Sequence, residues 1–336
     1  MYRLAINGYG RIGRSVLRAL HASPFRADMQ IVAINEPADS ETICHLTRFD
    51  STHGRFAGTV ALQDEQLIID QQAIALSHHT QVSDIRWPDV DLVLECSGAF
   101  SDRATAEQHL QAGARKVLFS QPAHADVDLT VVYGVNHQQL TATDTILSNA
   151  SCTTNACVAI LQLLHQHYGI ISGASTTIHS AMNDQPVIDA YHHTDLRKTR
   201  SASCSMIPVD TDLARGIERL LPELTGRLTA QAIRIPTMNV SALDISLVLE
   251  KNTDLTHVNQ LLCHYAQTQA RIVSYNQEPL ASVDFNHDSH SAIIDATQTR
   301  VSRDGHLLKV FIWFDNEWGD ANRMLDVAHY LRGLSL

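Results

Sequence analysis

Residues 4–14 read Leu-Ala-Ile-Asn-Gly-Tyr-Gly-Arg-Ile-Gly-Arg and say more about the architecture than any other stretch. The three apolar residues predict a short buried strand, and Gly8, Gly10 and Gly13 match the pattern G-x-G-x-x-G. Apolar residues then recur at helical spacing, so strand, glycine turn and helix follow in the order of a dinucleotide-binding unit. A pyrophosphate is expected on the helix N terminus, where unpaired N–H groups face the anion.

A carboxylate follows the next expected strand. Residues 31–35 read Ile-Val-Ala-Ile-Asn, and Glu36 comes directly after them, where a ribose-binding carboxylate is expected. As a ribose ligand, Glu36 would repel the extra phosphate of NADP, so we predict a preference for NAD. The alternative interpretation is that Glu36 is a solvated strand end.

Two more segments continue the doubly wound pattern. Residues 90–96 and 116–120 read as buried parallel strands. Ser97 and Ser120 stand at their carboxyl ends, which face the cofactor crevice in such sheets. Both serines are therefore candidate cofactor contacts, although hydroxyls at turns are usually only caps.

One thiol stands among hydroxyls and amides. Residues 148–155 read Ser-Asn-Ala-Ser-Cys-Thr-Thr-Asn, and an apolar run begins a helix just behind Cys152. Exposed N–H groups and the positive end of the helix dipole favour the thiolate, which makes Cys152 a candidate nucleophile. The alternative is a small buried cysteine near a polar cap.

A histidine closes the next expected strand. Residues 175–182 alternate polar and apolar side chains and predict a strand that ends at His179. A histidine beside a thiolate can form an ion pair, lower the pKa of the thiol and later act as a base. The chain has 19 histidines, so an ordinary surface or core residue is the alternative.

The length of the chain and its pattern of expected strands indicate the number of domains and the fold class. The 336 residues suffice for two domains, with a boundary expected near residues 148–151. Beyond it, residues 243–249 and 310–314 read as strands with fewer helices between them. We therefore predict an α/β fold, in which a Rossmann-type doubly wound parallel sheet (1–150) precedes an α+β domain with a mixed or antiparallel sheet (151–315).

Charge, cysteine spacing and hydropathy argue against nucleic acid, metal and membrane as partners. The formal charge of −11 argues against nucleic acid as the main partner, although a local basic patch can still hold phosphate. Six cysteines without a C-x-x-C pair indicate reduced thiols in the cytosol, and the histidine pairs lack the neighbours of a closed metal site, so no metal is expected. A strand starts soon after Met1 and no apolar run reaches membrane-spanning length, so we expect a soluble cytoplasmic protein without a membrane partner.

Several motifs together resemble the glyceraldehyde-3-phosphate dehydrogenase family over nearly the whole chain. They lie at residues 6–14, 50–56, 151–155, 207–208, 234–237 and 315–319. Within that family the chain is most similar to the erythrose-4-phosphate dehydrogenases, at residues 178–182, 187–192, 207–211 and 282–288. The resemblance implies NAD as cofactor, an aldose phosphate as substrate and a homotetramer.

The resemblance also implies roles for individual residues. A C-terminal helix, about residues 316–336, would complete the first domain and bring Asn316 to the nicotinamide amide. The residues expected at the cofactor are Asn7, Gly8, Gly10, Arg11, Ile12, Gly13, Glu36, Ser97, Ser120 and Asn316. The residues expected at the substrate are Ser151, Thr153, Arg197, Arg200, Thr211, Asp212 and Arg234, with Lys198 in the same basic cluster.

The chemistry implied is covalent. Cys152 would attack the aldehyde carbon, the Cys152 N–H and the His179 ring would stabilise the oxyanion, and His179 would take the hydroxyl proton as a thioester forms. Water or phosphate would then release the acyl group. Thr153 and Thr211 are expected at the acyl-side anion position, and Arg234 near the substrate phosphate.

Departures from the family decide between substrates. Met182 stands where a phosphate-binding threonine is usual, and Asp212 where glycine is usual; methionine cannot donate to phosphate and a carboxylate repels it. We therefore predict non-phosphorylating oxidation of D-erythrose 4-phosphate to 4-phosphoerythronate, feeding pyridoxal 5′-phosphate synthesis. The alternatives are a phosphorylating glyceraldehyde-3-phosphate dehydrogenase and an NAD-binding regulatory or scaffold protein. Thr80 and Asp320 replace an expected arginine and an expected aromatic residue, and both changes are expected to weaken NAD binding.

Overall fold

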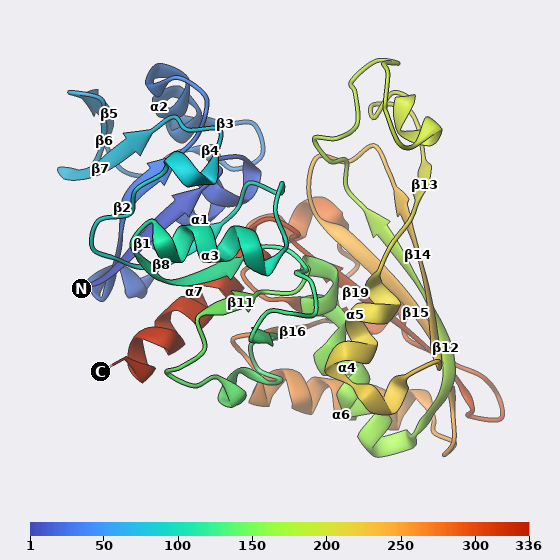
Figure 1. Cartoon of the computed structure of the whole chain (residues 1–336). Coiled ribbons are helices and arrows are strands. Elements are labelled where there is room, and N and C mark those ends of the chain that lie inside the picture. The colour runs from blue at the N-terminus through green and yellow to red at the C-terminus, as the bar shows by residue number, and fades with distance from the viewer. Residues whose placement is uncertain (336) are drawn as a thin grey trace. The chain divides into compact units, whose positions relative to one another are not determined.

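The structure, a computed structural model, describes residues 1–335 and divides into two compact units (Figure 1). The first is Met1–Ser151 together with the residues from Asp320 onward, and the second is Cys152–Gly319. Residue 336, the last of the expected C-terminal helix, lies outside the described residues.

A twisted sheet forms the centre of the first unit. Its strand order is β10-β11-β9-β8-β1-β2-β7-β6-β5, and the strands from β10 to β7 pair in parallel. The strands are β1 (Tyr2–Asn7), β2 (Met29–Asn35), β5 (Val60–Gln63), β6 (Gln66–Ile69), β7 (Gln72–Ser77), β8 (Val90–Glu95), β9 (Ala114–Phe119), β10 (Leu129–Thr130) and β11 (Ile146–Ser148), with a separate pair β3 (Phe49–Asp50) and β4 (Gly54–Arg55). The predicted doubly wound parallel sheet is confirmed, since β1, β8 and β9 are almost wholly buried.

An antiparallel edge on this sheet was not expected. Strands β5, β6 and β7 pair antiparallel through two tight turns. Each turn has two consecutive residues in the left-handed region, Asp64 and Glu65 (φ 49° and 57°), then Asp70 and Gln71 (φ 47° and 71°). Such turns match the right-handed twist of paired strands, which explains a hairpin edge where the sequence pattern predicted only crossovers.

The helices of the first unit are α1 (Arg11–Ala22), α2 (Ser40–Arg48), α3 (Arg103–Gln111) and most of α7 (Trp318–Leu334). Asp39 and Asp102 cap α2 and α3 by accepting from the N–H groups of Thr42 and Thr105. Helix α7 is tied to the start of β2 because Arg332 donates to Asp28 at 2.8 Å.

A mixed sheet forms the second unit. Its order is β13-β14-β12-β15-β19-β17-β16, where β12 pairs in parallel with β14 and β16 with β17. The elements are α4 (Cys152–Tyr168), β12 (Ile170–His179), β13 (Ile207–Val209), α5 (Leu213–Leu220), β14 (Leu228–Arg234), β15 (Ser241–Leu249), α6 (Leu255–Thr268), β16 (Val273–Asn276), β17 (Ala292–Asp295), β18 (Arg300–Val301) and β19 (Leu307–Phe314). The strands expected at 243–249 and 310–314 lie within β15 and β19, so the α+β prediction is confirmed.

Helix α4 fixes the position of Cys152, the first residue of the second unit. It packs on β12, β15, β17 and β19, and it buries an almost continuous run from Thr154 to Leu161 against them. The packing of that run determines the position of Cys152 at the helix N terminus. Searched over residues 1–335, the chain has no helix that is both long enough and apolar enough to cross a membrane.

Candidate functional site

A cavity of about 280 Å³ lies at the carboxyl ends of the parallel strands in the first unit. Of the residues predicted for the cofactor, those that line it are Asn7, Gly8, Gly10, Glu36 and Ser97. Thr80, Cys96 and Phe100, which were not predicted as cofactor contacts, also line the cavity. A crevice at strand ends is where open α/β sheets bind nucleotides.

The glycine loop fits an anionic, closely approaching group. Gly8 has φ +85°, and a Cβ added there would lie 2.3 Å from the Cα of Ser97. A Cβ on Gly13 would lie 2.4 Å from the carbonyl oxygen of Gly8. A Cβ on Gly10 would meet no described atom within 4 Å, and no side chain caps α1 or places an acid in its first turn. A helix N terminus without a capping side chain or an acid nearby is the kind of site to which a pyrophosphate binds.

Glu36 holds the same loop. Its Oε2 accepts from the backbone N–H of Tyr9 at 2.7 Å, and its Oε1 accepts from the N–H of Ala38 at 3.4 Å. The carboxylate therefore joins the end of β2 to the glycine turn while it lines the cavity. The sequence predicted the carboxylate at this position but not its bond to the loop.

A buried network that sequence reasoning missed supports the cavity. Asn7 donates to Glu95 at 2.6 Å, and the backbone N–H of Ser97 donates to the other oxygen of Glu95 at 2.8 Å. Trp87 donates to Nδ1 of His109 at 3.0 Å, so Nε2 of His109 carries a proton and donates to Glu95 at 2.9 Å. Glu95 ends β8 and lies two residues before Ser97. This closeness to a predicted site residue was the one signal in the sequence that could have pointed to Glu95.

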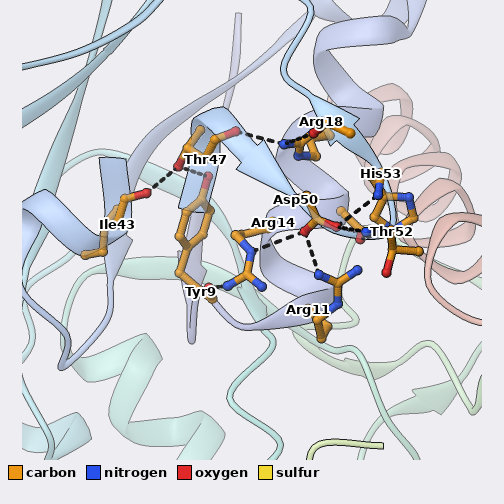
Figure 2. Close-up of polar contacts among 11 residues, drawn as sticks. Tyr9, Arg11, Arg14, Arg18, Ile43, Thr47, Asp50, Thr52 and His53 are labelled. Carbon is orange, nitrogen blue, oxygen red and sulfur yellow. Dashed lines mark hydrogen bonds and ion pairs between the residues drawn. The ribbon is translucent and has the colours of Figure 1, made fainter. Parts of the chain in front are cut away.

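Arg11 is directed at a carboxylate and does not line the cavity (Figure 2). Its guanidinium donates to Asp50 at 2.5 Å, and Asp50 also accepts from the N–H groups of Thr52 and His53. Burial alone would raise the pKa of Asp50, but the bonds from Arg11 and from the N–H of His53 hold it well below its usual range.

The other cofactor candidates of the first unit that do not line the cavity are Ile12, Gly13 and Ser120. Ile12 and Gly13 lie in the first turn of α1. The N–H of Ser120, just beyond β9, donates to the carbonyl of Glu95 at 3.0 Å.

In the second unit, a thiol and an imidazole face each other. Cys152 is the first residue of α4 and His179 is the last of β12, as predicted. The Sγ of Cys152 lies 4.0 Å from Nε2 of His179 and 3.9 Å from the hydroxyl of Thr153. Ala150, two residues earlier, has φ 59°, a conformation that is strained for a residue with a Cβ.

The main chain sets the tautomer of the imidazole. Nδ1 of His179 lies 2.8 Å from the carbonyl oxygen of Ser180, so Nδ1 donates and the neutral ring presents an acceptor, Nε2, to the thiol. Burial lowers the pKa of His179, and the positive charge of Arg234 acts in the same direction. A neutral imidazole is the form that can accept a proton.

Three strand ends meet beside His179. Ser180 follows β12, Ser241 opens β15 and Asn316 follows β19 by two residues. Oδ1 of Asn316 accepts from the hydroxyl of Ser180 at 3.0 Å and from that of Ser241 at 2.9 Å. Asn316 was predicted from the sequence, whereas the two serines were not.

Arg234 is held beside the imidazole. It is buried and pairs in register with His179 across β14 and β12. Its guanidinium donates to Asp184 at 2.5 Å, and Lys198 donates to the second oxygen of Asp184 at 2.9 Å. One carboxylate therefore holds two cations, which sequence reasoning did not foresee.

The other predicted substrate residues are less constrained. Arg197 is exposed, and Arg200 pairs with Asp189 at 3.1 Å while its side chain stays 66% exposed. Thr211 accepts from the N–H of Leu213 at 3.2 Å, and Ser151 directly precedes α4. The side chain of Asp212 is 78% exposed and lies 3.1 Å from Arg215.

A carboxyl group is buried at the start of α7 in the first unit. Asp320 is 5% exposed and accepts from Nδ2 of Asn149 at 3.0 Å. Burial raises its pKa to about 8, although the bond from Asn149 and the charge of Arg323 oppose the shift. Sequence reasoning identified the residue as a departure but not its burial.

Comparison with known families agrees with this geometry. Residues 2–103 match the NAD binding domain of glyceraldehyde 3-phosphate dehydrogenase. Residues 151–316 match its C-terminal domain, and that match contains both Cys152 and His179. The glycine loop and the cavity thus lie in a domain whose cofactor is NAD. The chain belongs to the glyceraldehyde 3-phosphate dehydrogenase family and is an NAD-dependent oxidoreductase.

Proposed function

We propose that the protein oxidises D-erythrose 4-phosphate to 4-phosphoerythronate without taking up inorganic phosphate. The observation that carries this choice is Met182, a half-exposed thioether at a position where a phosphate-binding threonine is usual in the family. A thioether cannot donate a hydrogen bond to a phosphate oxygen. Loss of that donor supports a site that is relaxed for a longer aldose and for water as the acyl acceptor.

Asp212 supports the same choice less strongly. Its carboxylate would repel an incoming phosphate, but Arg215 lies 3.1 Å away and both side chains are mostly exposed. Solvent and salt screen charges in such positions, so the repulsion is small at physiological ionic strength.

The chemistry follows from Cys152 and His179. Nε2 of His179 takes the thiol proton, and the thiolate attacks the aldehyde carbon. The Cys152 N–H and the protonated ring stabilise the resulting oxyanion, which takes the proton of the ring and becomes a hydroxyl. NAD, when bound, accepts the hydride. His179 takes the hydroxyl proton as the carbonyl reforms, which leaves an acyl thioester on Cys152. The protonated ring loses that proton to solvent and, neutral again, removes a proton from water, which displaces the thiolate.

The direct test is steady-state NAD reduction with D-erythrose 4-phosphate and with D-glyceraldehyde 3-phosphate, each with and without phosphate. We expect higher kcat/KM for the four-carbon sugar and no requirement for phosphate. Turnover that needs phosphate or arsenate, with the three-carbon sugar preferred, would overturn the proposal. Met182→Thr with Asp212→Gly tests the cause, since the pair should increase acyl phosphate among the products.

A phosphorylating glyceraldehyde-3-phosphate dehydrogenase is the second candidate. Thr153 and Thr211, the residues expected at the acyl-side position, both carry hydroxyls, and Arg234 and Lys198 supply two cations that share Asp184. The phosphate dependence above separates the two activities. A burst of NADH from stoichiometric enzyme would exclude a scaffold that has lost catalysis.

We also propose that the protein is a cytoplasmic homotetramer whose product feeds pyridoxal 5′-phosphate synthesis. Large apolar side chains are exposed along the loop of residues 181–206, namely Met182, Val187, Ile188, Tyr191, Leu196 and Met206. Exposed apolar side chains gathered in one segment favour burial against another chain. Sedimentation velocity tests the assembly, and a monomer at micromolar concentration would contradict it.

A further inference from the structure

The hydroxyl of Ser180 lies between the imidazole and the amide of Asn316. Ser180 is fully buried and directly follows His179. Its carbonyl oxygen accepts from Nδ1 of His179 at 2.8 Å, while its Oγ donates to Oδ1 of Asn316 at 3.0 Å. One residue therefore anchors both side chains, through different atoms.

Ser241 completes the arrangement. It is 1% exposed and opens β15, which lies between β12 and β19 in the sheet. Its Oγ accepts from the backbone N–H of Ser180 at 3.1 Å and donates to Oδ1 of Asn316 at 2.9 Å. The three residues therefore connect the ends of three neighbouring strands.

The two hydroxyl protons determine which way the amide of Asn316 faces. A serine hydroxyl has one proton, and within residues 1–335 Oδ1 of Asn316 is the acceptor for both. If the amide were rotated by half a turn, Nδ2 would face the hydroxyls and both buried protons would lose their acceptor. Nδ2 of Asn316 has no acceptor within the described part of the chain and stays available as a donor.

We propose that Ser180 and Ser241 are positioning residues that present Nδ2 of Asn316 to a carbonyl acceptor, the carboxamide oxygen of the nicotinamide of NAD. The inference rests on the sequence prediction that Asn316 faces the nicotinamide amide of the cofactor. It adds that a pair of buried hydroxyls dictates the polarity of that contact. The His179 ring is anchored to the carbonyl of Ser180, so removal of the hydroxyl alters the amide and leaves the ring in place.

The test compares two ligands in the absence of any aldose. ADP-ribose lacks the nicotinamide, so titration calorimetry with NAD and with ADP-ribose locates an effect at one end of the cofactor. Ser180→Ala and Ser241→Ala should each weaken NAD binding about two- to tenfold, as one lost neutral hydrogen bond does, and leave ADP-ribose unchanged. Ser175→Ala is the matched control, because Ser175 is a buried serine of β12 whose hydroxyl contacts Thr229 and not Asn316.

A double-mutant cycle makes the test specific. In an Asn316→Ala background, Ser180→Ala should have no further effect on NAD binding. Equal weakening of both ligands, an undiminished effect in that background, or no effect at all would overturn the inference. Alkylation of Cys152 by iodoacetamide should keep its pH dependence in Ser180→Ala; a changed profile would show that Ser180 acts through His179 and would overturn it too.

The same design separates this inference from the proposed function. Binding is measured without substrate, so a wild-type protein that binds NAD but oxidises neither aldose phosphate would remove the proposed function alone. A wild-type protein that oxidises erythrose 4-phosphate, with variants that bind NAD as tightly as the wild type, would remove this inference alone.

Discussion

The side chains around His179 and those of the loop that follows it, residues 181–206, are held in different ways. Around His179, buried hydroxyl and carbonyl groups at adjacent strand ends fix each polar atom at 2.8 to 3.1 Å from its partner. In the loop, Arg200 and Asp189 pair while their side chains stay 66% and 60% exposed. A buried group left without its partner costs about 1 to 3 kcal/mol, whereas an exposed ion pair contributes about 0 to 1 kcal/mol.

The contrast separates two requirements of one reaction. Proton and acyl transfer need fixed geometry between Cys152 and His179, which strand ends and a helix start supply. In the proposed reaction, binding the phosphate of a flexible sugar needs positive charge more than fixed geometry, and the solvent-exposed loop is proposed to supply that charge. Arg234 combines both properties, because it carries a positive charge and is buried, and Asp184 holds it next to His179.

The largest expected effect on kcat comes from a change at the fixed pair of Cys152 and His179. Cys152→Ser should lower kcat by about 10⁴-fold or more, because serine lacks the thiolate on which acyl transfer depends. The Kd for NAD should stay within about twofold of the wild-type value, as no cofactor contact is removed. Undiminished oxidation of the sugar phosphate would contradict the covalent mechanism. The contrast between the site around His179 and the exposed loop would then have no meaning for catalysis.

His179→Asn should lower kcat by about 10²- to 10⁴-fold, the usual contribution of a positioned base. The wild-type pH profile checks the environment as well. His179 must be neutral to accept a proton, and because its pKa is lowered from 6.5 the acid limb of kcat should fall below pH 6.5. A limb above pH 6.5 would show that an acidic neighbour, and not burial, dominates at this site.

Asp320 tests the rule that a buried polar group needs a partner that suits its charge. Its pKa is raised from 3.8 to about 8, so the folded state holds a proton that the unfolded chain has lost above pH 4. Stability should therefore fall as the pH rises from about 4 to about 8. The ionisable groups that interact with it are Arg323 of its own helix and the buried thiol of Cys96, just beyond β8.

Asp320→Asn removes the ionisation and nearly preserves the shape. Relative to the wild type, the free energy of unfolding of this variant should increase by about 2 to 4 kcal/mol between pH 5 and pH 8. Urea unfolding at both pH values measures the change, with Asp212→Asn as the exposed control. A difference that is the same at both pH values would show that Asp320 is ionised in the folded protein.

The smallest effect is expected in the loop. Asp189→Asn should change the free energy of unfolding by less than about 1 kcal/mol, because its pair with Arg200 is solvated. Arg200→Ala should lower kcat/KM only a few-fold at low salt, and the difference should fade as salt is added. A loss that persists at high salt would instead show direct contact with the substrate phosphate.

Local patterns predicted the elements that carry the site. The glycine turn before α1, Cys152 at the start of α4 and His179 at the end of β12 were all foreseen, because each depends on a strand or helix boundary nearby in the sequence. The bond from the N–H of Ser180 to Ser241 spans 61 positions, and the bond from the hydroxyl of Ser180 to Asn316 spans 136. Contacts of that separation depend on sheet order, which local periodicity does not report.

Burial of polar groups was likewise out of reach. Glu95 and His109 are buried as a pair from β8 and α3, and the pattern of either segment alone predicts only an apolar strand and a polar helix. The hairpin edge of β5, β6 and β7 was missed for a different reason. Its turns use Asp, Glu and Gln in the left-handed region, where glycine or asparagine is the usual signal.

The bond from Tyr9 to Glu36 constrains any redesign of cofactor choice. If Glu36 repels the extra phosphate of NADP, as predicted, then replacing this carboxylate is the direct way to admit NADP. Removing the carboxylate would also leave the Tyr9 N–H without its acceptor, which lies 2.7 Å away, and would release the turn that is predicted to bind the pyrophosphate. Cofactor swapping in this scaffold therefore needs a replacement such as glutamine, which keeps an oxygen for the turn while it removes the negative charge.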